Sequence, residues 1–398
     1  MIEKRTDLAI ELRESYPEDN VEIEGVVLNE QIVQKGNIRI STVNIVNEYG
    51  SKWMKKPVGN YVTIEFTDKS TYMDDAETKE FESKVKELET IYPNIPSIGC
   101  VGQSYGGTTV LEKGILVTAF CGDVTVAANV LTDVSKMPVK RIYQFEQDVR
   151  QVGGTSSNTV CIDFCSNNDE CVLTTMKTVL KKGQIQLTGG TAWEGLVSAN
   201  GTVYQDACAY AIVKNHSGKV KVYKENLYLR TDKKYIVTKA IPEKDIICEL
   251  NGEPFQNVYT RECNVTPDQI GNQTFVNPLG RVIGNETYIV SLKEDAGNKA
   301  YACYRKVFPK DVVYFLQIGE IDQIVKGTVS DIQKDFKRIS GIFSINCLFR
   351  YLLFQQNHYD KNYFQQMNDL GTHAGLIGLG EHYNGQHTNQ TFSCVVFE

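Results

Sequence analysis

The closing stretch of the chain, residues 375–397, gathers the groups best suited to bind a ligand. Two apolar, strand-like runs flank a polar segment that is dense in glycine, asparagine and histidine. Glycine inside a strand pattern, as at Gly380, indicates a close approach of the backbone, often to a ligand. Glu381, His387 and Asn389 then supply hydrogen-bonding groups of both kinds within a short span. This pattern predicts the wall of a polar pocket rather than a catalytic centre.

Arg350 and Cys347 add two groups with stronger chemistry. Arg350 can hold a ligand carboxylate through two parallel hydrogen bonds, but an ion pair with Glu381 would satisfy its charge equally well, and both interpretations stay open. Cys347 can act as a nucleophile only beside a base, for which His387 or His373 is available. A buried, inert thiol is the favoured interpretation.

Other motifs give weaker signals. The glycine-rich turn at residues 102–107 lacks the patterns of phosphate-binding loops, so nucleotide binding is not expected there. Cys161, Cys165 and Cys171 form the tightest cysteine group, and strand thiols beside a loop thiol explain them better than a structural zinc site. We therefore expect no metal and no cofactor.

Composition excludes several classes of protein. The chain has 398 residues, 41% of them hydrophobic and 23% charged, which is typical of a soluble globular protein long enough for more than one domain. A net charge of −7 disfavours nucleic-acid partners. No apolar run reaches the length of a membrane span, and the N-terminus does not read as a secretory signal. The 11 dispersed cysteines fit a reducing cytoplasm, so we expect a cytoplasmic protein without membrane association.

Hydrophobic periodicity predicts an α/β (mixed α+β) fold. Residues 61–100 read as strand, helix and strand, with the second strand parallel to the first. Further elements are predicted as helices over 139–152 and 170–180, a buried strand over 159–164, and strands over 201–214 and 219–229 that a turn at 215–218 would join as a hairpin.

The opening of the chain resembles the start of the spore germination protease family. The resemblance is carried by Arg5-Thr6-Asp7-Leu8-Ala9, by residues 38–43 and by residues 56–65. In that family the catalytic aspartates lie beyond this region. Asp268 stands in a partial echo of their surroundings, but Thr266 as a cap with Pro267 in the first helical position explains that stretch. We therefore expect residues 1–60 to form a germination-protease-like N-terminal module without peptidase activity.

From about Tyr61 onward the chain resembles FIST-domain proteins, which are bacterial sensory modules with paired halves. Six motifs occur in the family's order: Ile98-Gly99-Cys100, Gly189-Gly190-Thr191-Ala192, Leu250-Asn251-Gly252-Glu253-Pro254, Asn277-Pro278-Leu279-Gly280, Asn346-Cys347-Leu348-Phe349-Arg350, and Gly378-Leu379-Gly380-Glu381 with His387-Thr388-Asn389-Gln390-Thr391. The resemblance implies two related halves with mixed sheets flanked by helices, over residues 61–230 and 231–398.

The resemblance implies that the protein senses a small polar metabolite, such as an amino acid, without being an enzyme. Output would pass to a histidine kinase, a cyclase or a chemoreceptor. The germination-protease-like N-terminal module separately implies a spore-forming bacterium. The expected ligand-binding residues are Cys100, Gly189, Gly190, Cys347, Arg350, Gly380, Glu381, His387 and Asn389. The alternatives are a protease-related or cysteine-dependent hydrolase and a haem-based gas sensor.

Overall fold

The computed structural model describes the backbone of residues 23–27, 32–35, 38–43, 59–67, 75–111, 114–284 and 286–398, and side chains from residue 78 onward except at 112–114 and 285. The fold is mixed α/β, as the sequence predicts. Asp7 and most of residues 1–60 lie outside the described residues.

The described chain repeats one arrangement of strands three times. Each unit has two parallel strands joined through helix, then a hairpin, then a strand antiparallel to the first. The first comprises β4 (Gly59–Thr67), α3 (Asp75–Ile91), β5 (Ser97–Val101), the hairpin β6 (Gln103–Gly106) and β7 (Thr109–Val110), β8 (Gly114–Cys121) and a following strand, β9 (Val124–Thr132). The predicted strand–helix–strand of residues 61–100 and its parallel pairing are thereby confirmed.

The second and third units follow the same order. After α4 (Ile142–Val152) the second comprises β10 (Thr159–Cys165), α5 (Asp169–Gly183), β11 (Gln186–Thr191), the turn η2 (Trp193–Gly195), the hairpin β12 (Val197–Ala199) and β13 (Thr202–Tyr204), β14 (Ala207–Asn215) and β15 (Val220–Asn226). The third comprises β24 (Gly341–Cys347), α8 (Leu348–Gln356), α9 (Asp360–Leu370), β25 (His373–Gly378), the hairpin β26 (Glu381–Tyr383) and β27 (Gln386–Thr388), and β28 (Thr391–Phe397).

The units exchange strands, so that each sheet is built from more than one unit. The hairpin of the first unit pairs through its strand β6 with β25 of the third unit. The hairpin of the second unit pairs through β12 with β5 of the first unit. The hairpin of the third unit pairs through β26 with β11 of the second unit. The following strands β9 and β15 pair with β14 and β28 of the next unit. The beginning of the chain contributes β1 (Ile23–Val27), β2 (Ile32–Lys35) and β3 (Ile38–Val43), of which β3 lies parallel to β8.

This exchange corrects one prediction. The turn at residues 215–218 does not close a hairpin, because β14 and β15 lie in different sheets.

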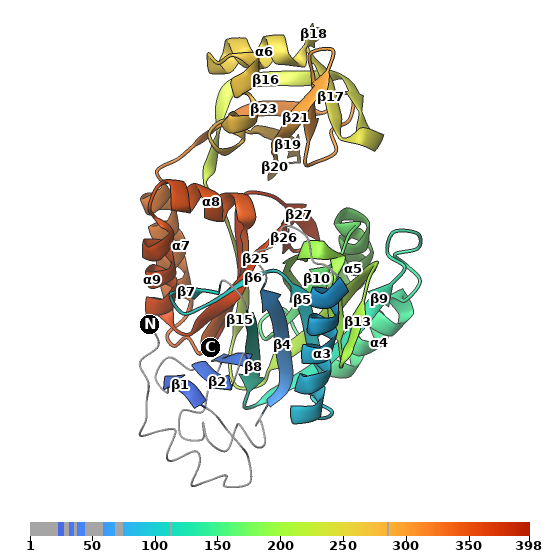
Figure 1. Cartoon of the computed structure of the whole chain (residues 1–398), viewed down its shortest axis with the longest axis vertical. Helices are drawn as coiled ribbons and strands as arrows, with labels where there is room; N and C mark the ends of the chain where they lie inside the picture. Colours follow the sequence, from blue (N-terminus) through green and yellow to red (C-terminus); the bar gives the residue numbers. More distant parts are fainter. Residues whose placement is uncertain are drawn as a thin grey trace.

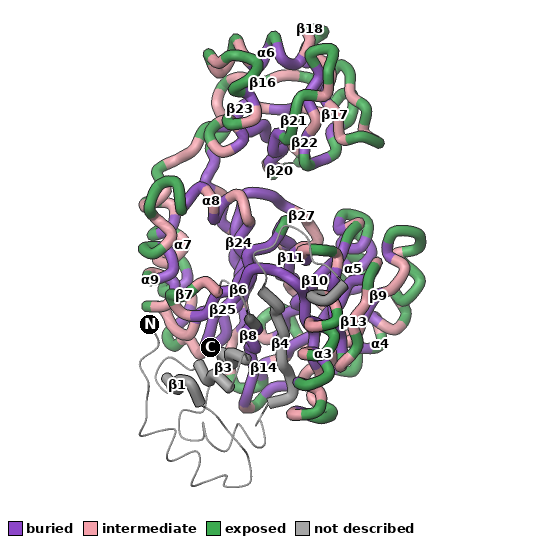
Figure 2. The backbone as a smooth tube through the Cα atoms, viewed as in Figure 1, coloured by how far each residue is buried: buried purple, intermediate pink, exposed green. Residues whose placement is uncertain are grey.

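Figure 1 shows the strands in the middle of the main body, with α7 (Ile321–Asp335), α8 and α9 on one side and α3, α4 and α5 on the other. Buried positions concentrate in these central strands (Figure 2), where inward residues such as Ile98, Phe164 and Phe343 form a core shared by three sheets.

A separate module stands above the main body in Figure 1, inserted between β15 and α7. It comprises β16 (Tyr228–Ile241), η3 (Pro242–Lys244), β17 (Ile246–Leu250), β18 (Glu253–Pro254), α6 (Phe255–Cys263), η4 (Pro267–Gln269), η5 (Gly271–Phe275), β19 (Leu279–Ile283), β20 (Glu286–Val290), β21 (Leu292–Gly297), β22 (Ala300–Cys303) and β23 (Val312–Ile318). The module has its own core, which includes Val237, Phe255 and Phe315. Residue 230, where the sequence places a boundary between two halves, lies inside β16, and that division stays a prediction.

Gly375→Ala tests the exchange of hairpins between units. Gly375 pairs with Tyr105 of β6, and a Cβ there would lie 2.7 Å from the Tyr105 hydroxyl and closer still to the Ser344 carbonyl oxygen. We expect the free energy of unfolding, measured by urea denaturation, to fall by about 1–3 kcal/mol or more through overpacking. Gly327→Ala, in α7 with open space around it, is the control and should raise it by about 0.5–1 kcal/mol. Equal stability of Gly375→Ala and the wild type would contradict the packing described here.

Candidate functional site

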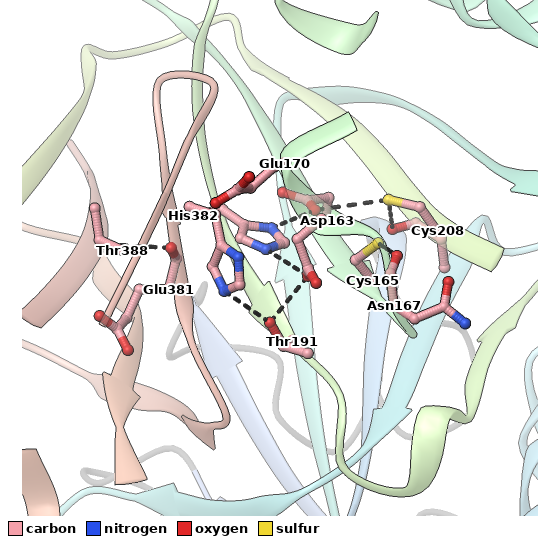
Figure 3. A network of polar contacts seen from close by, with 12 residues as sticks. Asp163, Cys165, Asn167, Glu170, Thr191, Cys208, Glu381, His382 and Thr388 are labelled. Carbon is pink, nitrogen blue, oxygen red and sulfur yellow. Dashed lines mark hydrogen bonds and ion pairs between the residues drawn. The ribbon is translucent and has the colours of Figure 1, made fainter. Parts of the chain in front are cut away.

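A buried histidine joins the third unit's hairpin to the second unit's sheet. Nδ1 of His382 lies 2.7 Å from Oδ2 of Asp163, and its Nε2 lies 2.9 Å from Oδ1 of Asp169. The three side chains belong to β26, β10 and the start of α5, and all are buried. Figure 3 shows the ring of His382 between the hairpin and Asp163. Because a carboxylate only accepts hydrogen bonds, both contacts are satisfied when both ring nitrogens carry a proton. The geometry therefore favours a charged imidazolium between two carboxylates.

The electrostatic surroundings agree with that assignment. Burial opposes the charge of His382, but Asp163 and Asp169 raise the pKa of its ring well above the ordinary value. Burial opposes the charge of both aspartates: it raises the pKa of Asp163 despite the neighbouring His382, whereas His387 and His382 hold the pKa of Asp169 below its usual range. Buried charges are tolerated when they are paired and hydrogen-bonded in this way, and removing one partner is strongly destabilising.

Gly189, Gly190 and Gly380, which were predicted to line a ligand site, lie in close contact with other atoms of the protein. A Cβ on Gly189 would collide with the backbone and carboxylate of Asp163, and one on Gly190 would lie 2.8 Å from the carbonyl oxygen of Gly380. A Cβ on Gly380 would overlap the ring of His387. The Gly-Gly pair thus lets the hairpin and the Asp163 side chain approach β11 closely, in register with Glu381 and His382.

A hydrogen-bonded chain continues from this network toward the inserted module. Oγ1 of Thr191 donates to Oδ1 of Asp169 over 2.9 Å and lies 3.3 Å from Nε2 of His387. Nη1 of Arg305, a module residue, donates to Nδ1 of His387 over 2.6 Å and to Oε1 of Glu170 over 3.1 Å. Since arginine can only donate, Nδ1 of His387 accepts and its Nε2 carries the proton toward Thr191.

The same contacts bear on metal binding. Ligand atoms of Asp169, His382 and His387 lie within 4.8 Å of one another, which is close enough to hold an ion. A metal needs an unprotonated ring nitrogen from each histidine. Here His382 directs both nitrogens at carboxylates, and Arg305 occupies the free lone pair of His387. In this arrangement the ring nitrogens of His382 and His387 are therefore occupied by hydrogen bonds and are not free to bind a metal ion.

The chain of hydrogen bonds ends at a cavity of about 220 Å³ between the main body and the module. The main body contributes Glu170, Thr174 and Lys177 of α5 and the hairpin residues Gly385, Gln386 and His387. The module contributes Arg281, Ile283, Tyr288, Ile289, Val290, Arg305 and Lys306. Of the residues predicted to bind ligand, His387 lines this cavity, Glu381 lies on β26 of the hairpin that carries it, and Gly380 directly precedes β26.

Cys347 faces Glu381 rather than a histidine. Burial and the neighbouring Glu381 carboxyl raise the pKa of this thiol well above its ordinary value, which keeps it protonated. Burial likewise raises the pKa of Glu381 to about 7, although the Thr391 N–H donates to its Oε2 over 3.0 Å. Cys347 is therefore a neutral thiol, and the Glu381 carboxyl group beside it titrates near neutral pH. The second candidate base, His373, hydrogen-bonds Ser344 over 2.7 Å instead.

Three other predicted residues lie away from the cavity lining. Arg350 is fully buried, pairs with Glu225 of β15 rather than Glu381, and donates to Oδ1 of Asn346 over 2.7 Å. Its guanidinium also packs over the rings of Phe354, Tyr363 and Phe392. Cys100 belongs to the shared core, and Asn389 is buried between β27 and β28.

Four residues of the network were not predicted from the sequence: Asp163, Asp169, His382 and Arg305. Asp163 carried a usable signal, because a charged residue stands inside the apolar run of β10. Asp169 resembled an ordinary acidic helix start, and His382 is adjacent to Glu381 in the stretch already selected. Arg305 follows β22 of the module, and nothing local in the sequence connects it to the hairpin.

The predicted explanation of Asp268 is confirmed. Asp268 is exposed in η4, where Thr266 and Gln269 form a reciprocal capping box and Pro267 occupies the first position. Among the described residues, no helix has the length and apolar character that crossing a bilayer requires.

Comparison with known proteins finds two resemblances in different parts of the chain. Residues 72–253 match the FIST N domain family, so the predicted resemblance to FIST proteins is confirmed over that span. A FIST domain is a sensory domain of signal transduction. The FIST-like interpretation of the C-terminal part stays a prediction.

The N-terminal region is similar to germination proteases. It is 46% identical over 82 residues to the germination protease of Clostridium tetani, covering 20% of this chain and 24% of that protein. It is 48% identical over 73 residues to that of Clostridium perfringens strain SM101, covering 18% and 22%, and 51% identical over 61 residues to that of Caldanaerobacter subterraneus subsp. tengcongensis, covering 15% and 18%. The similarity thus spans about a quarter of these relatives or less.

Glu381→Gln tests the raised pKa of the buried carboxyl. The pKa of Glu381 is about 7 in the folded protein, against an ordinary value of 4.5. The protonated carboxyl therefore contributes fully to the stability of the fold below pH 4.5, and this contribution is lost as the pH rises through 7. Glutamine mimics the protonated acid and does not titrate. We expect the difference in the free energy of unfolding, Glu381→Gln minus wild type, to increase by about 3 kcal/mol as the pH is raised from below 4.5 to above 7. Urea denaturation at several pH values measures it.

Glu87→Gln, on the partly exposed face of α3, controls for the removal of a carboxyl group elsewhere. Curves for Glu381→Gln and wild type that stay parallel from acidic to alkaline pH would show that Glu381 does not titrate in this window.

Proposed function

We propose that this protein is a non-enzymatic sensor that binds a small polar metabolite in the cavity between α5, the β26–β27 hairpin and the inserted module. The FIST N domain match supports a sensory role, and Arg305 supports the position of the site. This module residue is only 9% exposed, yet it reaches the main body and ends beside the cavity. A ligand bound there touches both parts of the molecule.

Binding at such a junction can be converted into a signal. A ligand that contacts both parts stabilises the arrangement in which it fits, so its binding energy biases the position of the module. The output partner is then a separate histidine kinase, cyclase or chemoreceptor that distinguishes the two arrangements. The N-terminal similarity to germination proteases favours a spore-forming bacterium as the source. The free cysteines of the described chain favour a reducing, cytoplasmic location.

The site's chemistry favours binding over hydrolysis. A cysteine hydrolase needs an activated thiolate, whereas Cys347 is buried with a raised pKa and a carboxyl neighbour. An aspartic peptidase needs two carboxyl groups that share a cleft. Asp163 and Asp169 are instead occupied by His382.

Arg305→Gln tests the position of the site. A thermal-shift screen of amino acids, small carboxylates, organic phosphates and neutral metabolites should find a compound that stabilises the wild type by about 2.7 kcal/mol at a hundred times its Kd. Because Arg305 lines the cavity, we expect Arg305→Gln to lose that shift. Arg150→Gln, which removes an exposed arginine from α4, should retain it. A shift that persists in Arg305→Gln would place the ligand elsewhere, and a screen without any stabiliser would contradict the proposed function.

A further inference from the structure

From the charges around this cavity we infer that its ligand is a small dianion, a metabolite that carries two negative charges as a phosphate monoester or a dicarboxylate does. This inference rests on the proposed function and names the class of ligand for the same site. It departs from the amino acid expected from the sequence, because an amino acid with a neutral side chain has no net charge.

The charge balance of the lining carries the inference. The lining residues include four cations, Lys177, Arg281, Arg305 and Lys306, and a single carboxylate, Glu170. Glu170 pairs with Arg305. Arg281 pairs with Asp311, which is not one of the lining residues, through a 2.7 Å contact. Lys177 and Lys306 have no ion-pair partner among the described residues, and burial and Arg305 lower the pKa of His387 so that it adds no charge. Two positive charges, on exposed lysines, are therefore left without an ionic partner among the described residues, and an anion bound in the cavity would pair with them.

Unused hydrogen-bonding capacity points the same way. Nη2 of Arg305 is buried and has no hydrogen-bond partner among the described residues, although Nη1 makes two contacts. A buried donor without a partner is costly, and a ligand oxygen placed there removes that cost. Oε1 of Gln386, also buried and without a partner in the described chain, offers an acceptor for a ligand hydroxyl or amino group. The site thus suits an anionic group joined to a polar body.

Packing keeps one of the two lysines at the cavity. Gly385 occupies the β26–β27 turn with a φ of +77°, and a Cβ there would lie 2.8 Å from Cδ of Lys177. The aliphatic stem of Lys177 therefore packs against the turn, and Lys177 is one of the residues that line the cavity. Tyr288, Ile289 and Val290 supply an uncharged wall on the module side. The volume of about 220 Å³ is below the range of about 300–1,000 Å³ typical of drug-sized ligands, so the dianion is small.

Isothermal titration calorimetry of the full chain with four compounds of similar size tests this inference. The probes are glycerol 3-phosphate and succinate as dianions, glycine as a zwitterion and glycerol as a neutral compound. We expect at least one dianion to bind about tenfold or more tightly than glycine and glycerol, with an affinity that falls as salt is raised.

Charge-removing variants assign the binding to the cavity. The double variant Lys177→Gln/Lys306→Gln should weaken dianion binding by about tenfold or more, because it removes both unpaired charges. Lys334→Gln, which removes an exposed lysine from α7, should leave the affinity unchanged. Glycine binding as tightly as either dianion, or dianion binding that the double variant retains, would overturn the inference while leaving a sensor in place. Absence of binding by all four compounds here, with no stabiliser in the thermal-shift screen, would instead contradict the sensor itself.

Discussion

The clamp of Asp163, His382 and Asp169 is the interaction on which the rest of the site depends. A protonated imidazole between two carboxylates is favourable in a buried setting only if both hydrogen bonds form together. These bonds hold the β26–β27 hairpin against β11, and they do so across the Gly189–Gly190 pair, which admits no side chain. The position of the hairpin then sets the position of His387, and through it the contact with Arg305.

The exchange of strands gives this local clamp a wider role. Because the hairpin of each unit completes the sheet of another, no unit has a full sheet without its neighbours. The cavity lies where the second unit's helix, the third unit's hairpin and the inserted module meet. A directional chain of hydrogen bonds runs from Arg305 through His387 and Thr191 to the clamp. Ligand contacts at the cavity and the buried charges are thus parts of one connected network.

Local sequence signals were enough to predict most elements and the region of the site. The predicted strand–helix–strand of residues 61–100 and the predicted buried strand of residues 159–164 correspond to observed elements, and the stretch around Glu381 and His387 does lie beside the cavity. What could not be predicted depends on contacts between distant segments. Arg350 meets Glu225 instead of Glu381 because β15 crosses to the third unit's sheet.

Nitrogen-15 NMR of the histidine side chains, with His382 assigned through loss of its signals in His382→Asn, tests the central claim most directly. At about pH 8, well above the ordinary histidine pKa of about 6.5, we expect both ring nitrogens of His382 to be protonated while His387 is neutral. A neutral His382 ring under these conditions would contradict a charged clamp that holds the hairpin.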